Sequence, residues 1–133
     1  MNQSKQMYLE NGFRWTSHLE EFCNEYGGRE IDYPHPFTGE MVNTRFCIPE
    51  TVRVGRKYGQ YETTVNHLGE EIAPVGECSN GNIELLLTES GRLIGFADYM
   101  LLSWSAEGEH DNCRASLARL LQGIKPESTG LID

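Results

Sequence analysis

The chain lacks any apolar run long enough to cross a membrane, and it lacks a recognisable export signal. Its longest uninterrupted apolar stretches are only a few residues, whereas a membrane-spanning helix needs about 20. The opening residues, MNQSKQMYLENG, contain neither the basic segment nor the apolar segment of a secretory signal. We therefore expect a cytoplasmic protein.

Closely spaced cysteines are also missing. The four cysteines, Cys23, Cys47, Cys78 and Cys113, lie far apart and form no C-x-x-C pair. An even count permits two disulfides, but nothing in the sequence indicates export. We expect four free thiols, buried or half-buried.

The common catalytic motifs are absent: there is no G-x-S-x-G, glycine-rich phosphate loop, H-E-x-x-H or EF-hand loop. Residues 107–113 do gather carboxylates, an imidazole and a thiol, but one loop supplies them all. An acidic loop leading into a helix capped by Asp111 is favoured there over a metal site. Cys23 could pair with His35 or His67, yet it lies on the apolar stripe of a helix, which favours a structural thiol. We expect no catalysis, no metal and no cofactor.

Basic residues are scarce, with 11 Lys and Arg against 20 Asp and Glu in 133 residues, a net charge of −9. Residues 45–66 carry a net charge of +2, whereas residues 67–111 hold nine acidic residues against one basic residue. Such a balance disfavours direct binding to nucleic acid and favours a basic protein partner. The alternative is that the acidic residues only keep the protein soluble.

The stretch from Pro74 to Phe96 organises the predicted fold. Turn-forming residues at 79–82 and 89–91 divide it into two or three short strands. Two paired strands are not stable alone in water, so other elements must cover their apolar face. We expect amphipathic helices on either side of this stretch to provide the cover, and the one over residues 17–26 has clear start and stop signals. Its apolar residues follow helical spacing, a capping box joins Ser17 to Glu20, and two glycines end it.

Further helices are predicted over residues 3–10, 56–68 and 113–124, and further strands over 29–33, 45–48 and 100–104. The order of elements indicates an α+β fold: a twisted antiparallel sheet packed by N-terminal, middle and C-terminal helices. We expect a single domain over residues 1–133, with its core at about 13–126 and a frayed tail at 127–133.

Several of these segments together resemble a known family. They are the helix at 19–26 running into Gly27-Gly28, His-Leu-Gly at 67–69, Pro-Val-Gly-Glu at 74–77, the strand and turn at 84–92, and the helix end at 115–126. In order and spacing this set resembles the SUKH superfamily of bacterial immunity proteins, and within it the third SUKH family. The resemblance covers about residues 13–126, and the segment 33–61 falls outside the matching motifs.

The resemblance implies a SUKH-like immunity domain that binds and neutralises a cognate polymorphic toxin encoded beside it. Toxins countered by this superfamily are frequently nucleases or nucleic-acid deaminases. It also implies no catalysis and no cofactor. The matching glycines are expected to serve the backbone rather than binding; they are Gly27, Gly28, Gly76 and Gly91.

For partner contact we expect a surface that combines acidic residues with aromatic anchors. The acidic candidates are Glu70, Glu71, Glu107, Glu109 and Asp111, and the aromatic candidates are Tyr33, Phe37 and Trp104. The loop at 33–37 could instead close over one end of the core. Two other functions stay open: a protein-interaction or regulatory module of the same fold without a toxin partner, and a small enzyme using residues 107–113.

Overall fold

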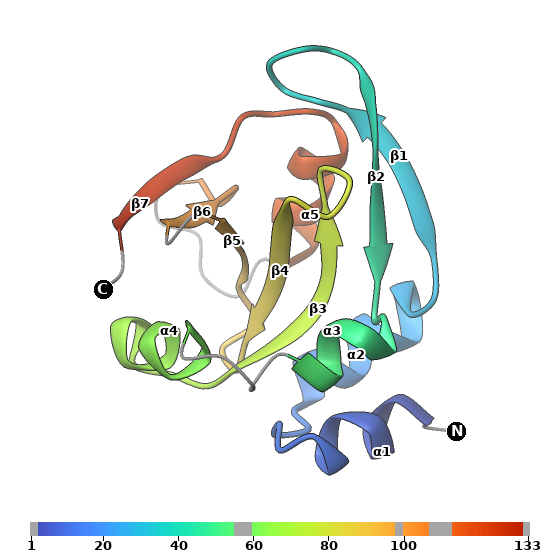
Figure 1. The fold of residues 1–133 in the computed structure, drawn as a ribbon, viewed down its shortest axis with the longest axis vertical. Coiled ribbons are helices and arrows are strands. Elements are labelled where there is room, and N and C mark those ends of the chain that lie inside the picture. Colours follow the sequence, from blue (N-terminus) through green and yellow to red (C-terminus); the bar gives the residue numbers. More distant parts are fainter. Residues whose placement is uncertain (1–2, 55–59, 98–99, 107–112, 132–133) are drawn as a thin grey trace.

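A computed structural model describes residues 3–54, 60–97, 100–106 and 113–131 (Figure 1). Within them the chain forms one seven-stranded sheet, whose strand order is the chain order. Every neighbouring pair of strands is antiparallel. The strands are β1 (Glu30–Pro34), β2 (Met41–Phe46), β3 (Ile72–Cys78), β4 (Ile83–Thr88), β5 (Leu93–Ala97), β6 (Met100–Ser103) and β7 (Glu127–Leu131).

Five helices accompany the sheet in the described part of the chain. They are α1 (Gln3–Glu10), α2 (Ser17–Tyr26), α3 (Pro49–Val54), α4 (Gln60–Leu68) and α5 (Cys113–Leu121). This arrangement is a single α+β domain with an antiparallel sheet, as the sequence predicted. The expected buried or half-buried free thiols are also confirmed for all four cysteines.

The sheet curls around α5. This helix packs against β1, at one edge of the sheet, and also against β5. In Figure 1 it lies behind β3 and β4, and the chain that follows it crosses above the sheet to reach β7. The curl forms a buried core between α5, α2 and the sheet, to which Leu19, Phe46, Leu85, Leu117 and Leu120 each contribute a side chain with at most 1% exposure. Burying such side chains is the main stabilising contribution.

The prediction of a frayed tail is wrong for its described residues. Residues 127–131 form β7, in which Ser128 pairs with Leu102 and Glu127 pairs with Ser103 of β6. A strand at the edge of a sheet offers a row of free backbone groups, and β7 satisfies those of β6. This pairing depends on the whole sheet, so no local pattern in residues 127–131 reveals it.

The start of α2 also differs from the prediction. Thr16, not Ser17, is the N-cap: its backbone is extended and its hydroxyl oxygen accepts a hydrogen bond from Leu19 N at 3.1 Å. The apolar stripe is as predicted, because Leu19, Phe22 and Cys23 are buried. A threonine followed by a serine offers two possible caps; Thr16 has the extended backbone of an N-cap, whereas Ser17 is already the first helical residue.

Candidate functional site

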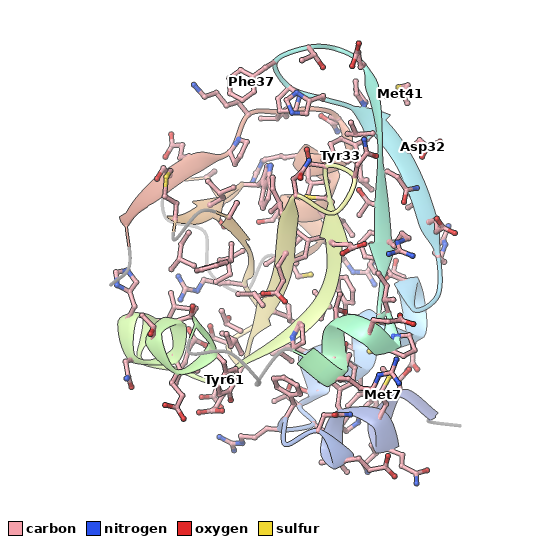
Figure 2. All side chains as sticks on the ribbon, in the orientation of Figure 1. Met7, Asp32, Tyr33, Phe37, Met41 and Tyr61 are labelled. Carbon is pink, nitrogen blue, oxygen red and sulfur yellow. The ribbon has the colours of Figure 1, made fainter. Side chains whose placement is uncertain are left out.

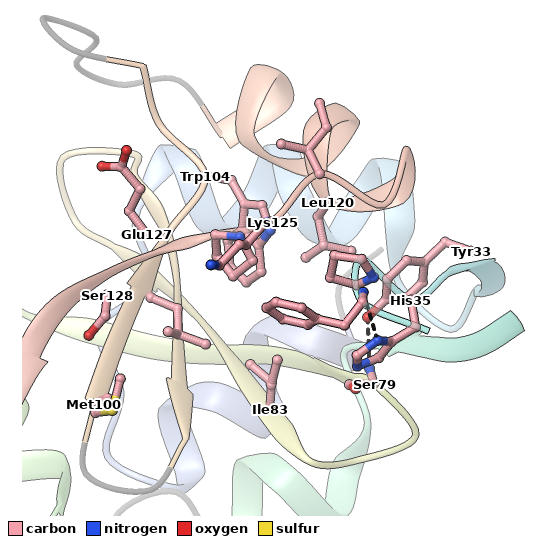
Figure 3. A pocket seen from close by; sticks show the side chains of 15 residues that line it. Tyr33, His35, Ser79, Ile83, Met100, Trp104, Leu120, Lys125, Glu127 and Ser128 are labelled. Atoms are coloured by element: carbon pink, nitrogen blue, oxygen red, sulfur yellow. Dashed lines mark hydrogen bonds between the residues drawn. The ribbon is translucent and has the colours of Figure 1, made fainter. Parts of the chain in front are cut away.

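One end of the curled sheet forms a hollow of about 790 Å³, which is the candidate site. Its walls come from the β1–β2 loop and the α5–β7 connection, and its floor comes from β4, β6 and the segment after β6 (Figure 3). The lining is mostly apolar, with Ile83, Met100 and Leu102 on the floor. A concave, mostly apolar hollow of this volume is typical of a binding site.

All three aromatic residues expected at an interface line this hollow. Tyr33 lies on β1, Phe37 lies in the β1–β2 loop and Trp104 follows β6. Tyr33 and Trp104 are 4% and 5% exposed, whereas Phe37 is 68% exposed. The hollow therefore has a buried aromatic side chain in its wall (Tyr33), another in its floor (Trp104) and one exposed aromatic ring at its rim (Phe37).

Tyr33 is held by the β3–β4 turn. Its hydroxyl oxygen accepts a hydrogen bond from Ser79 N at 3.0 Å. Ser79 and Asn80 both have left-handed backbones, with φ of 55° and 57°. The side-chain oxygen of Asn80 accepts a hydrogen bond from Asn43 N on β2 at 2.8 Å. Burial raises the pKa of Tyr33 above its ordinary value, so the ring stays neutral and acts as an apolar wall.

Trp104 lies across a glycine. A Cβ atom at Gly95 of β5 would come within 3.0 Å of Trp104 Cη2 and 2.9 Å of Ile83 Cγ2. The indole ring can rest on the sheet because position 95 has no side chain. The backbone oxygen of Trp104 also accepts a hydrogen bond from Arg119 Nη1 of α5 at 2.8 Å. The floor of the hollow is thereby tied to α5.

Hydrogen bonds shape the β1–β2 loop, which places Phe37 at the rim of the hollow, on the side of the α5–β7 connection (Figure 2). His35 Nδ1 accepts hydrogen bonds from Phe37 N at 3.2 Å and from Thr38 N at 3.3 Å. His35 N donates to Glu40 O, and Gly39 N donates to His35 O, which closes the loop. A large apolar side chain on a shaped loop, exposed to water, is typical of a contact residue.

The α5–β7 connection completes the opposite wall. Lys125 Nζ lies 5.1 Å from the centre of the Phe37 ring, within the range of a cation–π interaction. Ile124, 45% exposed, is also part of the lining. Of the four exposed large hydrophobic residues among those described, Phe37 and Ile124 therefore belong to the hollow. The sequence did not indicate Ile124 or Lys125 as site residues: it predicted a helix over 113–124 that includes Ile124, whereas α5 ends at Leu121 and leaves Ile124 in the connection.

Glu70 and Glu71 lie elsewhere, at the α4–β3 connection. Glu70 forms an ion pair with Arg92 at 2.9 Å and accepts hydrogen bonds from Ser90 N at 2.9 Å and Ser90 Oγ at 3.1 Å. Burial opposes the charge of Glu70, but the bonds from Arg92 and Ser90 hold its pKa below the ordinary value. Glu71 accepts a hydrogen bond from the Tyr61 hydroxyl. Both carboxylates thus bind neighbouring elements of the same chain.

The other acidic candidates, Glu107, Glu109 and Asp111, lie outside the described residues. Within the described part of 67–111, none of the acidic side chains is fully exposed. All five are half-buried, namely those of Glu70, Glu71, Glu77, Glu84 and Glu89. The exposed acidic side chains come instead from residues 10–62 and from Glu127. Of these, Glu127 lines the hollow. Glu40 lies in the β1–β2 loop, which forms one of its walls.

The structure does not place Cys23 in a thiol–imidazole pair. Cys23 Sγ lies 3.3 Å from Cys47 Sγ, and both cysteines are buried. His35 is used within its own loop, and His67 is exposed on α4. Among the described residues, no group of three or more His, Cys, Asp and Glu side chains is arranged to hold a metal ion.

None of the described helices combines the length and the apolar character needed to cross a membrane. The chain was compared with protein-family models, with curated proteins and with solved structures, and no match was found in any of the three.

Proposed function

We propose that this protein is a cytoplasmic bacterial immunity protein of the SUKH type. It binds a cognate polymorphic toxin domain, a nuclease or nucleic-acid deaminase, and neutralises it by contact without catalysis. The hollow between the β1–β2 loop and the α5–β7 connection is its docking surface. The observation that carries the proposal is Phe37, a 68% exposed aromatic side chain on a shaped loop, at the rim of an apolar hollow.

The apolar part of the contact would come from the hollow itself. Protein interfaces concentrate their binding energy in a few aromatic or aliphatic anchors that sit in pockets of the partner. Tyr33 and Trp104 are already ordered by contacts within the fold, so an apolar side chain of the toxin could enter between them at little cost in conformational entropy. Phe37 and Ile124 would lose exposed apolar surface on binding, which adds a favourable hydrophobic contribution.

The charge of the chain supports a basic partner. A domain that acts on nucleic acid must approach phosphate groups and is therefore usually basic. The chain carries a net charge of −9, and Glu40 and Glu127 add exposed carboxylates near the hollow. Opposite charges accelerate the encounter of two proteins and favour the correct partner over others.

The decisive experiment measures binding of the full chain to the toxin domain encoded beside it. Phe37→Ala should raise the dissociation constant at least tenfold, because it removes the exposed anchor. Met41→Ala is the matched control, since Met41 is 62% exposed but does not line the hollow; its dissociation constant should stay within twofold of wild type. Isothermal titration calorimetry gives both values.

Two results would count against the proposal in different ways. Equal losses for Phe37→Ala and Met41→Ala, or no loss for either, would remove the hollow as docking surface. Failure of the wild-type chain to bind the neighbouring gene product, or to rescue cells that express it, would remove the toxin and favour an interaction module with another partner. Reversing Glu107, Glu109 and Asp111 to Lys tests the electrostatic part of the proposal. A dissociation constant that keeps the same value and the same dependence on salt concentration would contradict it.

A further inference from the structure

Two cysteine thiols from different elements meet near the end of β2 that is farther from the hollow. Cys23 lies in the middle of α2, and Cys47 directly follows β2. Their sulfur atoms are 3.3 Å apart, and each residue is 8% exposed. Cys78 and Cys113 are also free thiols, which makes them internal controls.

The backbones on both sides of this contact are fixed by hydrogen bonds. Cys47 has a left-handed backbone with φ of 54°, and its N–H donates to Val75 O of β3 at 2.9 Å. The Cys23 backbone oxygen accepts a hydrogen bond from Gly27 N at 3.0 Å, at the end of α2. A non-glycine residue with positive φ is uncommon and persists only when its surroundings determine it. The approach of the two sulfurs is therefore a property of the packed core.

The rings around the pair reinforce this packing. Phe22, next to Cys23, packs edge-on against Phe46, next to Cys47, with ring centres 5.6 Å apart. Tyr8 of α1 is fully buried, and its hydroxyl donates to Pro74 O at 2.6 Å. The hydrogen bond with Cys47, together with burial, raises the pKa of Cys23, while the same hydrogen bond lowers the pKa of Cys47 against the effect of burial. Cys47 is thus the more readily ionised of the two, and the thiolate is the form that attacks a disulfide.

We propose that Cys23 and Cys47 form a redox-active dithiol that small-molecule disulfides, such as oxidised glutathione, convert into an intramolecular disulfide. Cys47 loses its proton to solvent and attacks one sulfur of the oxidant, which releases one thiolate and leaves a mixed disulfide on Cys47. Cys23 then loses its proton and attacks Cys47 Sγ, which releases the second thiolate. In sum, the two protein thiols give up two electrons and two protons, and the oxidant is reduced to two thiols.

The geometry favours the second step over a stable mixed disulfide. The sulfurs are 3.3 Å apart, and a disulfide bond is about 2.05 Å long. They must therefore approach each other by only about 1.25 Å. The attacking and resolving groups are already in contact, so closure of the ring is intramolecular and needs no large movement. The product would link α2 covalently to the corner between β2 and α3, and it would constrain the unfolded chain.

The test incubates the full chain in glutathione buffers of graded oxidising strength, alkylates the remaining thiols after denaturation, and maps the peptides by mass spectrometry. We expect a peptide pair joined through Cys23 and Cys47, two hydrogens lighter than the reduced pair, with Cys78 and Cys113 fully alkylated. The oxidised chain should also unfold at a higher urea concentration than the reduced chain.

Variants separate the dithiol from general cysteine oxidation. In Cys23→Ala the resolving thiol is gone, so Cys47 should accumulate as a mixed disulfide with glutathione, whereas Cys78→Ala should leave the Cys23–Cys47 product unchanged. The proposal is overturned if Cys23 and Cys47 both remain alkylated in the wild-type chain at every glutathione ratio. It is overturned equally if Cys78 or Cys113 appears in the major cross-link. The wild-type map decides the question even if a variant fails to fold.

Discussion

Glu84 is a carboxyl group held within the sheet beside a second carboxyl group. It lies on β4, opposite Glu77 of β3 and Phe96 of β5. Glu84 lines a small pocket together with Tyr61 and Thr64 of α4 and with Phe96, while Glu77 has its own ion pair with Arg45 at 2.6 Å. Burial, followed by the charge of Glu77, raises the pKa of Glu84 to about 7. Glu84 is therefore protonated in the folded protein at a pH where it is ionised in the unfolded chain.

This shift predicts a measurable dependence of stability on pH. The folded pKa of Glu84 lies above its unfolded value, so its favourable contribution is complete below about pH 4.5 and is lost as the pH rises to about 7. Glu84→Gln cannot ionise, so the free energy of unfolding of this variant, minus that of wild type, should increase by roughly 3 kcal/mol over that interval. Urea unfolding at several pH values measures the difference.

Glu77→Gln provides the control for the cause of the shift. Removing the neighbouring charge should lower the pKa of Glu84, because like charges disfavour ionisation. When Glu84→Gln is added to the Glu77→Gln variant, the resulting change in the free energy of unfolding should therefore reach its plateau at a lower pH. The raised pKa of Glu84 would be contradicted if the effect of Glu84→Gln on the free energy of unfolding were independent of pH both in the wild-type chain and in the Glu77→Gln variant.

At the scale of elements, α2 shows how a helix start is selected. Thr16 and Ser17 are adjacent hydroxyl residues, and only Thr16 caps the helix through Leu19 N. We expect Thr16→Ala to lower the free energy of unfolding by about 1 kcal/mol, because a backbone N–H loses its partner. Ser17→Ala should change it by less than about 0.5 kcal/mol, since Ser17 is exposed at the first helical position. Equal effects of the two substitutions, measured by urea unfolding, would show that the cap is shared.

Elements with local signals were predictable from the sequence, and elements with long-range causes were not. The turn residues around β4 and the apolar stripe of α2 are local, and both elements are present where the sequence predicted them. α3 has six residues, too few to display a helical period. β7 forms by pairing with the edge of β6, and no sequence pattern in residues 127–131 indicates this pairing. Long-range pairing of this kind can be predicted only after the sheet order is known.

The candidate site shows the same division. Residue type alone indicated Tyr33, Phe37 and Trp104, and the fold brings them to one hollow. Their convergence follows from the curl of the sheet around α5, so the sequence could not predict it. Charge alone indicated Glu70 and Glu71, but charge does not reveal an internal partner such as Arg92. Ile124 and Lys125 gain their position from the same curl.

At the scale of the whole molecule, the curl depends on a close approach between the segment after α5 and the end of β1. Gly123, just after α5, lies against Pro34 at the end of β1. A Cβ atom at position 123 would come within 2.6 Å of Pro34 O, and the backbone there has a φ of 77°. The same approach sets the distance between the two walls of the hollow, because Phe37 follows Pro34 and Lys125 follows Gly123.

Gly123→Ala should therefore weaken both the fold and the hollow, and Gly69→Ala separates the two causes. Gly69 also follows a helix and has a φ of 75°, but a Cβ atom there would meet nothing within 4 Å. Gly69→Ala should cost about 1 kcal/mol, the backbone penalty alone, whereas Gly123→Ala should cost roughly 2 kcal/mol more because α5 must shift away from β1. Urea unfolding measures both costs, and NMR chemical shifts of Phe37 and Lys125 should move in Gly123→Ala but not in Gly69→Ala. Equal costs with unchanged Phe37 and Lys125 signals would mean that the contact between Gly123 and Pro34 does not hold the hollow in shape.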